Sequence, residues 1–365
     1  IVLAVLIRLA TAPLRWSSWN GAPVLFKDVF YAAIRTMLEH ITIAQARYMY
    51  KSTTDTYLDL CAETKAVPNS LHLDGVMCHW IGDEDADFVI LFLHGGGYTQ
   101  PCTIGHMQYF HRLISDLNAP TQPHSSASAS ASAAVLLPAY TLAPEAIFPT
   151  QLSQAATALS HLLTTRPPSR ILLTGDSAGG ALVLSLLSHI LHPHPHPSLA
   201  IPRIALAAPL AGVCVYSPWV SFSTAHASFA RNAQRDTLVP GMLRKWAAMF
   251  LGSARGEMPV KEVTEGDNYS EALLAGMGWW RGVHEKVGDV MVWAGEDEVF
   301  VDALREFGER FGEAWRVGGG EPEKATLEVA RGEAHIGPIM DVMFKYEGKS
   351  RAQVVVEEWW VQRLA

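Results

Sequence analysis

The sequence predicts an α/β protein with a mostly parallel central sheet and helices on both of its faces. Short, continuously apolar runs bounded by turn residues recur along the chain, and segments with helical periodicity separate them. At 365 residues the chain exceeds one average domain, but large α/β proteins often form a single core with insertions. We therefore expect one main domain with a helical cap.

The first 16 residues are apolar only up to Arg8, far short of the ~20 residues that cross a bilayer. Two interpretations are open: the end of a signal or anchor segment, or an amphipathic piece packed on the domain. Localisation therefore stays open between the cytoplasm and an endomembrane, as does contact with a membrane surface through the N-terminus.

Between Lys27 and Tyr50, apolar residues at helical spacing predict a helix packed on the core, with a lid or a membrane-surface helix as alternatives. The stripe consists of Phe30, Ile34, Met37, Leu38, Ile41 and Tyr48.

Seven further stretches are typical of strands, and a helix from about Gln151 to Thr165 separates the third from the fourth. The serine-rich segment 121–134 predicts a flexible surface insertion. The alternating prolines of residues 192–197 hold their histidines extended, which favours a loop over a metal site. The strand-like stretches are GVMCHWIG, DFVILFLH, AVLLPAY, ILLTG, AGVCVYSPWV, DVMVWAG and TLEVARGEAH.

Charge and cysteine content argue against several classes of partner. The net charge is -8, from 28 basic and 36 acidic residues, so no basic field exists to hold nucleic acid. Cys61, Cys78, Cys102 and Cys214 lie far apart and form no pair typical of zinc or redox chemistry. We expect neither a metal nor a cofactor.

A Gly-Asp-Ser-Ala-Gly turn, residues 175–179, lies between two apolar runs. Small residues around Ser177 would let a sharp strand-to-helix turn lift its hydroxyl above a sheet without clashes. Such a five-residue match arises by chance in about one chain of this length in ten. The turn therefore indicates a nucleophile only if the rest of the chain supports it.

A serine nucleophile needs a histidine base, an orienting carboxylate and donors for an oxyanion. The required parts occur in the order expected for a fold built on such a turn, each just after a predicted strand. They are HGGGY at 94–98, Ser177, AGEDEVFVD at 294–302 and GEAHIGP at 332–338.

Consecutive glycines after His94 would let the backbone present N–H groups to a ligand. We expect an oxyanion hole formed by Gly96, Gly97 and Ala178, the residue after the serine, with His94 bracing the loop. His335 is the expected base, because it alone among the histidines completes the ordered set.

The acid is open between residues that share one strand-to-helix turn: Glu296, Asp297, Glu298 and Asp302. Either Asp or Glu can orient a histidine. The remaining acids would be solvated or would interact with a helix dipole.

Five separated motifs together resemble the hormone-sensitive-lipase family of α/β-hydrolases (fold-3), especially the fungal-type esterases related to steryl acetyl hydrolases. The resemblance extends from about Gly75 to the C-terminus. Its motifs are HGGGY, YTLAPEAIFP at 140–149, GDSAGG at 175–180, YSPWV at 216–220, and the late acid and histidine.

The resemblance implies an eight-stranded α/β-hydrolase fold with a helical cap, and hydrolysis of carboxylic esters without a cofactor. It divides the chain into an N-terminal helical or cap region, residues 1–70, and a catalytic domain, residues 71–365, with a cap insertion around 222–287.

The family commonly reads Gly-x-x-Asp-x-x-x-Asp at the acid turn. Laid over GEDEVFVD, this spacing places Glu298 at the catalytic position and Asp302 at the second acid. Because the chain departs from the common aspartate, Asp297 stays an alternative. Asp176, Tyr140 and Glu145 resemble braces of neighbouring loops.

The expected substrate is a small hydrophobic ester with a short- to medium-chain acyl group, lipid and sterol esters included. An amidase, a formamidase or an acyltransferase could use the same residues. The plant gibberellin receptors resemble this family but bind without turnover, having lost the histidine; the presence of His335 argues against a receptor-like role. The sequence does not predict an oligomeric state.

Overall fold

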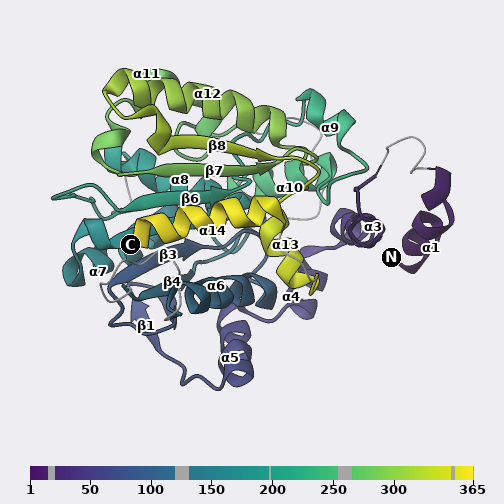
Figure 1. The fold of residues 1–365 in the computed structure, drawn as a ribbon, viewed down its shortest axis with the longest axis horizontal. Coiled ribbons are helices and arrows are strands. Elements are labelled where there is room, and N and C mark those ends of the chain that lie inside the picture. Colours follow the sequence, from purple (N-terminus) through teal and green to yellow (C-terminus); the bar gives the residue numbers. More distant parts are fainter. Residues whose placement is uncertain (15–20, 120–130, 197–198, 254–264, 347–349, 365) are drawn as a thin grey trace.

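The computed structural model describes residues 1–14, 21–119, 131–196, 199–253, 265–346 and 350–364 (Figure 1). Eight strands form one sheet in the order β1-β2-β4-β3-β5-β6-β7-β8. The first two strands pair antiparallel, as do β2 and β4, and every other pair is parallel. The strands are β1 Ser70–Leu73, β2 Val76–Ile81, β3 Phe88–Leu93, β4 Ala133–Ala139, β5 Ile171–Asp176, β6 Gly212–Tyr216, β7 Val290–Gly295 and β8 Ala325–Ala330.

Helices precede the sheet and connect its strands. The α-helices are α1 Val2–Ala10, α3 Leu25–His40, α4 Ile43–Met49, α5 Thr53–Thr64, α6 Ile104–Leu117, α7 Thr150–Thr165, α8 Ser177–Leu191, α9 Ala227–Arg231, α10 Pro240–Phe250, α11 Met277–Trp280, α12 Val301–Gly318, α13 Gly337–Met343 and α14 Arg351–Leu364. Short 3₁₀ helices are η1 Pro168–Arg170, η2 Ala272–Leu274, η3 Val283–Glu285 and η4 Pro322–Lys324.

Each face of the sheet packs on its own layer of helices. Alternate residues of β3 show this, because Val89 and Leu91 join the cluster with α7, α8 and α12, whereas Ile90 and Phe92 join the cluster with α6, α13 and α14. In Figure 1, α6 and α14 cross the near face of the sheet. The prediction of a mostly parallel sheet covered on both faces is confirmed.

All seven predicted strands are present, and the predicted helix corresponds to α7. The sequence analysis missed β1, a four-residue edge strand whose residues are exposed or half-buried and so carry no buried-strand pattern. Strand β6 ends earlier than its apolar run suggests, because Ser217 leaves the strand with a φ of 45°. The residues after it form a loop at the carboxyl edge.

The single helix predicted from Lys27 to Tyr50 is wrong: two helices, α3 and α4, occupy this stretch. The chain breaks at Thr42, which forms a capping box with Gln45 at the start of α4. The expected buried stripe is also wrong in part, because Phe30 is 38% and Tyr48 is 90% exposed. Instead, α3 buries Lys27, Asp28, Tyr31, Ala32 and Arg35.

Other predictions concern segments outside the sheet. Residues 121–130 of the serine-rich insertion lie outside the described residues, and the prediction is wrong for its last two residues, Ala133 and Ala134, because they are buried in β4. Residues 192–196 form a loop after α8, as expected. The four cysteines are buried and free. Among the described residues, no helix combines the length and apolarity that a membrane span requires.

Candidate active site

Ser177 occupies the sharp turn between β5 and α8, near the middle of the sheet's carboxyl edge. Its φ of 51° is left-handed, a strained conformation for a residue with a side chain, and its side chain is almost buried. A Cβ on Gly179 would collide with the carbonyl oxygen of Leu93, and one on Gly175 with Gly179. The glycines around the serine are therefore required by the close approach of β3 and α8.

The glycine loop after β3 lies against the start of α8. Gly96 and Gly97 have positive φ values of 104° and 59°. Within the described part of the chain, neither of their N–H groups has a hydrogen-bond acceptor. Asp176 fixes this loop, since its carboxylate accepts the Gly95 N–H at 2.8 Å. The loop thus presents backbone donors beside the serine turn.

His94 and Tyr140 support the glycine loop from beneath. The two rings stack with centroids 4.3 Å apart, and the Tyr140 hydroxyl donates to the His94 carbonyl oxygen at 2.6 Å. Burial lowers the pKa of His94 to about 4, so its imidazole is neutral. Both residues therefore brace the loop, as the sequence suggested.

Glu298 and His335 form a buried carboxylate–imidazole pair. The Glu298 Oε2 and His335 Nδ1 atoms are 2.9 Å apart, and Glu298 Oε1 accepts the Gly295 N–H at 2.9 Å. Burial alone would lower the pKa of His335, but the hydrogen bond and charge of Glu298 raise it above the ordinary 6.5. Burial raises the pKa of Glu298, which His335 opposes. The pair can hold a proton on the imidazole.

The other acids of this turn have different partners. Asp297 accepts from Arg235 Nη1 at 2.8 Å, and its carboxylate is not bonded to His335 within the described residues. Asp302 accepts the Ser228 N–H at 2.8 Å, and Glu296 is exposed. Geometry therefore separates the two acids that the sequence left open, and only Glu298 meets the imidazole.

The loop after β6 connects the serine to the histidine. The N–H of Trp219 donates to the Ser177 carbonyl oxygen at 2.9 Å. Two residues earlier, the Ser217 hydroxyl accepts the Ile336 N–H at 3.0 Å. The sequence analysis gave Ser217 no role, although it lies inside the YSPWV motif, which was the signal that could have identified it.

Aromatic side chains enclose the site. A Cβ on Gly97 would collide with the indole of Trp246, which therefore lies directly on the glycine loop. The ring of Phe300 meets the His335 ring edge to face, with centroids 5.2 Å apart. Tyr98 stacks on Phe250 at 3.7 Å. These rings make the surroundings of the candidate catalytic residues largely apolar.

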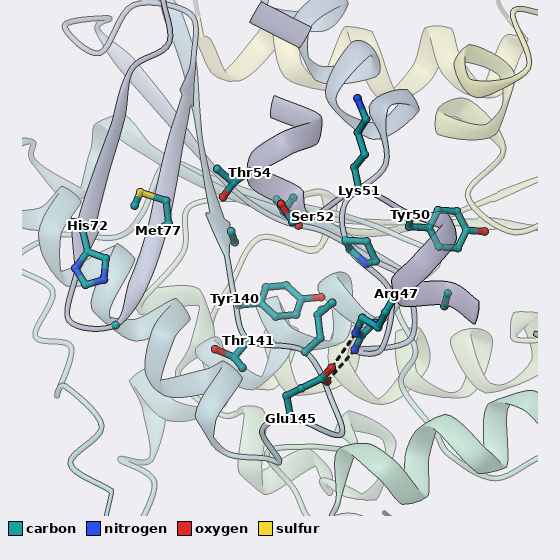
Figure 2. A pocket seen from close by; sticks show the side chains of 16 residues that line it. Arg47, Tyr50, Lys51, Ser52, Thr54, His72, Met77, Tyr140, Thr141 and Glu145 are labelled. Carbon is teal, nitrogen blue, oxygen red and sulfur yellow. Dashed lines mark hydrogen bonds and ion pairs between the residues drawn. The ribbon is translucent and has the colours of Figure 1, made fainter. Parts of the chain in front are cut away.

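A pocket of about 520 Å³ lies beyond the glycine loop, between the α4–α5 segment and strand β2 (Figure 2). Arg47 lines this pocket, pairs with Glu145 and donates to the Thr99 carbonyl oxygen at 2.5 Å. Neither Ser177 nor His335 lines this pocket. Arg47 and Glu145 therefore hold the loop from outside.

No group of three or more His, Cys, Asp or Glu side chains is arranged to hold a metal ion in the ranges that the structure describes. The candidate site is made of the serine turn, the carboxylate–imidazole pair and the backbone donors.

Comparison with known proteins identifies the family. The profile of the family described as alpha/beta hydrolase fold matches residues 90–335, which span the glycine loop, the serine turn, the acid turn and the histidine. The chain belongs to this α/β-hydrolase family.

Two relatives are named as acetyl-hydrolases. One, LipR of Mycobacterium tuberculosis, is 28% identical over 216 residues, 59% of this chain and 56% of the relative. Another, from Streptomyces hygroscopicus, is 31% identical over 180 residues, 49% of this chain and 52% of the relative. The chain spans about half the length of these relatives.

Solved structures share the fold. An esterase from the bacterial hormone-sensitive lipase family has a TM-score of 0.62 and 24% identity, over 92% of this chain and 98% of that one. EstE7, a hormone-sensitive-lipase homologue from a metagenome library, has a TM-score of 0.63 and 20% identity, over 92% of this chain and 98% of that one.

Proposed function

We propose that this protein is a serine hydrolase of carboxylic esters. Ser177 is the nucleophile, His335 the base and Glu298 the acid that orients it. The observation that carries the proposal is the buried Glu298–His335 pair, whose Nδ1–Oε2 distance is 2.9 Å, in a chain whose serine turn has a strained, left-handed serine. Membership of the α/β-hydrolase family and the names of the acetyl-hydrolase relatives support it.

The reaction follows from the roles of these groups. Ser177 attacks the ester carbonyl while His335 Nε2 takes its proton, and Glu298 keeps the other ring nitrogen protonated. The oxyanion binds the N–H groups of Gly96, Gly97 and Ala178. The histidine then protonates the departing alcohol, and water that it activates releases the acid from the acyl-enzyme.

The proposed substrate is a small, apolar ester. Trp246 on the glycine loop and the rings of Tyr98 and Phe250 leave an apolar surround that suits a hydrophobic acyl or alcohol group. This fits the motif resemblance to fungal-type esterases related to steryl acetyl hydrolases, which we propose as the narrower assignment.

We also propose that two regions form the cap. Residues 1–70 and the insertion around 222–287 contribute α3 and α10, and Arg35 of α3 donates to the Asp236 carbonyl oxygen in the insertion at 2.5 Å. This hydrogen bond joins the two regions beside the candidate site.

A chain-length series tests the function. We expect the purified protein to hydrolyse p-nitrophenyl esters, with acetate and butyrate preferred over palmitate, and the Ser177→Ala variant to lose activity by about a thousandfold or more. Thermal unfolding of both proteins controls for folding. A folded wild-type protein that turns over none of these esters would contradict the proposal.

A further inference from the structure

Asp236 is a buried carboxylate that no motif identified. It lies between α9 and α10 and is fully buried. Its Oδ2 atom accepts the Val299 N–H at 2.6 Å, and Oδ1 accepts the Thr237 N–H at 2.6 Å. The backbone N–H of His335 also faces this carboxylate and lowers its pKa. One side chain thus holds the residue after Glu298 and faces the backbone of His335.

Asp236 lies where two loops that follow different strands meet. The acid turn follows β7, and the histidine loop follows β8. Besides the Glu298–His335 hydrogen bond, the Asp236 carboxylate holds the acid turn through the Val299 N–H and faces the histidine loop. Because the Val299 N–H is fixed by the chain, this bond restrains the acid turn more tightly than a bond to a mobile side chain would.

The surroundings of Asp236 favour a charge that acts on the histidine. Burial raises the pKa of Asp236, but the charge of His335 and the three backbone N–H groups oppose this shift. A cation of the N-terminal region, Arg35, donates to the Asp236 carbonyl oxygen.

The imidazole of His335 is influenced by anions from three separate elements. Glu298 raises its pKa most, followed by Asp236 and by Asp176 at the end of β5. Tyr31, which also senses the charge of Asp236, is neutral, because burial raises its pKa far above the ordinary value. Asp297 lies near as well but is paired with Arg235.

We propose that Asp236 is a positioning residue of the hydrolase site: it fixes the acid turn beside the histidine loop, and its negative charge favours protonated His335. This inference rests on the proposed function. Asp236 would thereby support the step in which His335 holds the serine proton, without touching the substrate.

The test compares Asp236→Asn with Asp289→Asn. Asp289 is the control because it is a buried aspartate as well. It accepts from the Trp359 indole and pairs with Arg363, and it precedes β7, at the edge of the sheet opposite the candidate site. In Asp236→Asn we expect kcat on p-nitrophenyl acetate to fall about tenfold to a hundredfold with little change in KM. The acid limb of kcat/KM should move down by about one pH unit, because a neutral neighbour no longer stabilises the imidazolium.

A second variant, Asp236→Glu, distinguishes the effect of the negative charge from the effect of the carboxylate's position. It also replaces Asp236→Asn as the test if that variant does not fold. It keeps the anion, so we expect the acid limb to stay within about 0.3 pH unit of wild type while kcat falls. The inference is overturned if Asp236→Asn behaves like Asp289→Asn in both kcat and pH profile, or if Asp236→Glu retains wild-type kcat.

A measurement without turnover distinguishes this inference from the proposed function. The His335 imidazole is titrated by NMR in histidine-labelled protein, with its signal assigned by its loss in His335→Gln. A lower His335 pKa in Asp236→Asn supports the coupling even if the wild type hydrolyses no ester, which would sink only the proposed function. An active wild type with an unchanged His335 pKa in the variant would sink the inference alone.

Discussion

Helices α8 and α3 are almost equal in length but bury different kinds of side chain. Every residue of α8 from Ser177 to Ile190 is buried, and most are aliphatic or small. Helix α3 instead buries charged residues and leaves Phe26 and Phe30 at 41% and 38% exposure. Helix α8 carries the candidate nucleophile inside the core, where apolar packing fixes it.

The buried charges of α3 reach the back of the candidate site. Lys27 Nζ is 3.0 Å from Glu333 Oε2 and 2.8 Å from Asp341 Oδ1, which flank the histidine loop. Arg35 reaches the backbone of Asp236. The comparison teaches that the site is built by apolar packing on the nucleophile side and by polar contacts on the side of the acid and the histidine.

The largest expected effect separates the two adjacent acids on the polar side. Glu298→Gln should lower kcat/KM by about a thousandfold or more, because glutamine cannot stabilise the imidazolium. Asp297→Asn removes only the contact with Arg235 and should cost less than about tenfold. Steady-state kinetics on p-nitrophenyl acetate measures both, and equal losses would contradict the assignment of the acid.

Breaking the charge cluster of α3 should affect stability more than the chemistry. Lys27→Met leaves Glu333 and Asp341 buried without their cation and should cost about 3–5 kcal/mol in the free energy of unfolding. Urea denaturation checks this value. The matched control is Lys51→Met, because Lys51 is exposed and pairs with Asp59, and it should change stability by less than about 1 kcal/mol. If the two variants lost similar amounts of stability, the charge cluster around Lys27 would not stabilise the fold.

The pH dependence of wild-type activity tests the electrostatics of the polar side. His335 must be neutral to act as base, and Glu298 raises its pKa above 6.5. Activity should therefore be full at pH values above this raised pKa and fall about tenfold per pH unit below it. A kcat/KM profile gives the midpoint. A midpoint clearly below 6.5 would mean that the carboxylates do not stabilise the imidazolium.

The smallest effect is expected from a substitution of Tyr48 in α4, an exposed residue of the apolar stripe that the sequence predicted as buried. Tyr48 is 90% exposed, so Tyr48→Gln should change the free energy of unfolding by no more than about 0.5 kcal/mol. Leu182 in α8 is fully buried, and Leu182→Ala should cost about 2–5 kcal/mol. Urea denaturation of the two variants compares a buried position of α8 with an exposed position of α4, and similar costs would refute the contrast in burial.

The sequence predicted the parts whose signal is local. Apolar runs marked seven strands, and glycine spacing marked the turn of Ser177 and the loop of Gly96 and Gly97. The residues alone left the acid open, and only the family resemblance placed Glu298 ahead of Asp297, since one residue of offset decides only in three dimensions which carboxylate meets His335.

Other features depend on partners distant in the chain. The sequence pattern predicted an apolar buried face for α3. It could not show that Lys27 is buried, because the anions that pair with Lys27 lie about 300 residues later and helical periodicity carries no signal for such a pair. Asp236 escaped notice for the same reason: its carboxylate bonds the Val299 N–H, 63 residues later in the chain. Local patterns thus predict elements and motifs, and long-range polar contacts have to be seen in the fold.

The most direct test of the central claim is labelling with a serine-reactive fluorophosphonate, followed by intact mass and peptide mapping. We expect one adduct, on Ser177, formed rapidly in the wild type, much more slowly in His335→Ala and not in Ser177→Ala. An unlabelled Ser177 in the folded wild-type protein, or an adduct rate unaffected by the loss of His335, would contradict the proposed site.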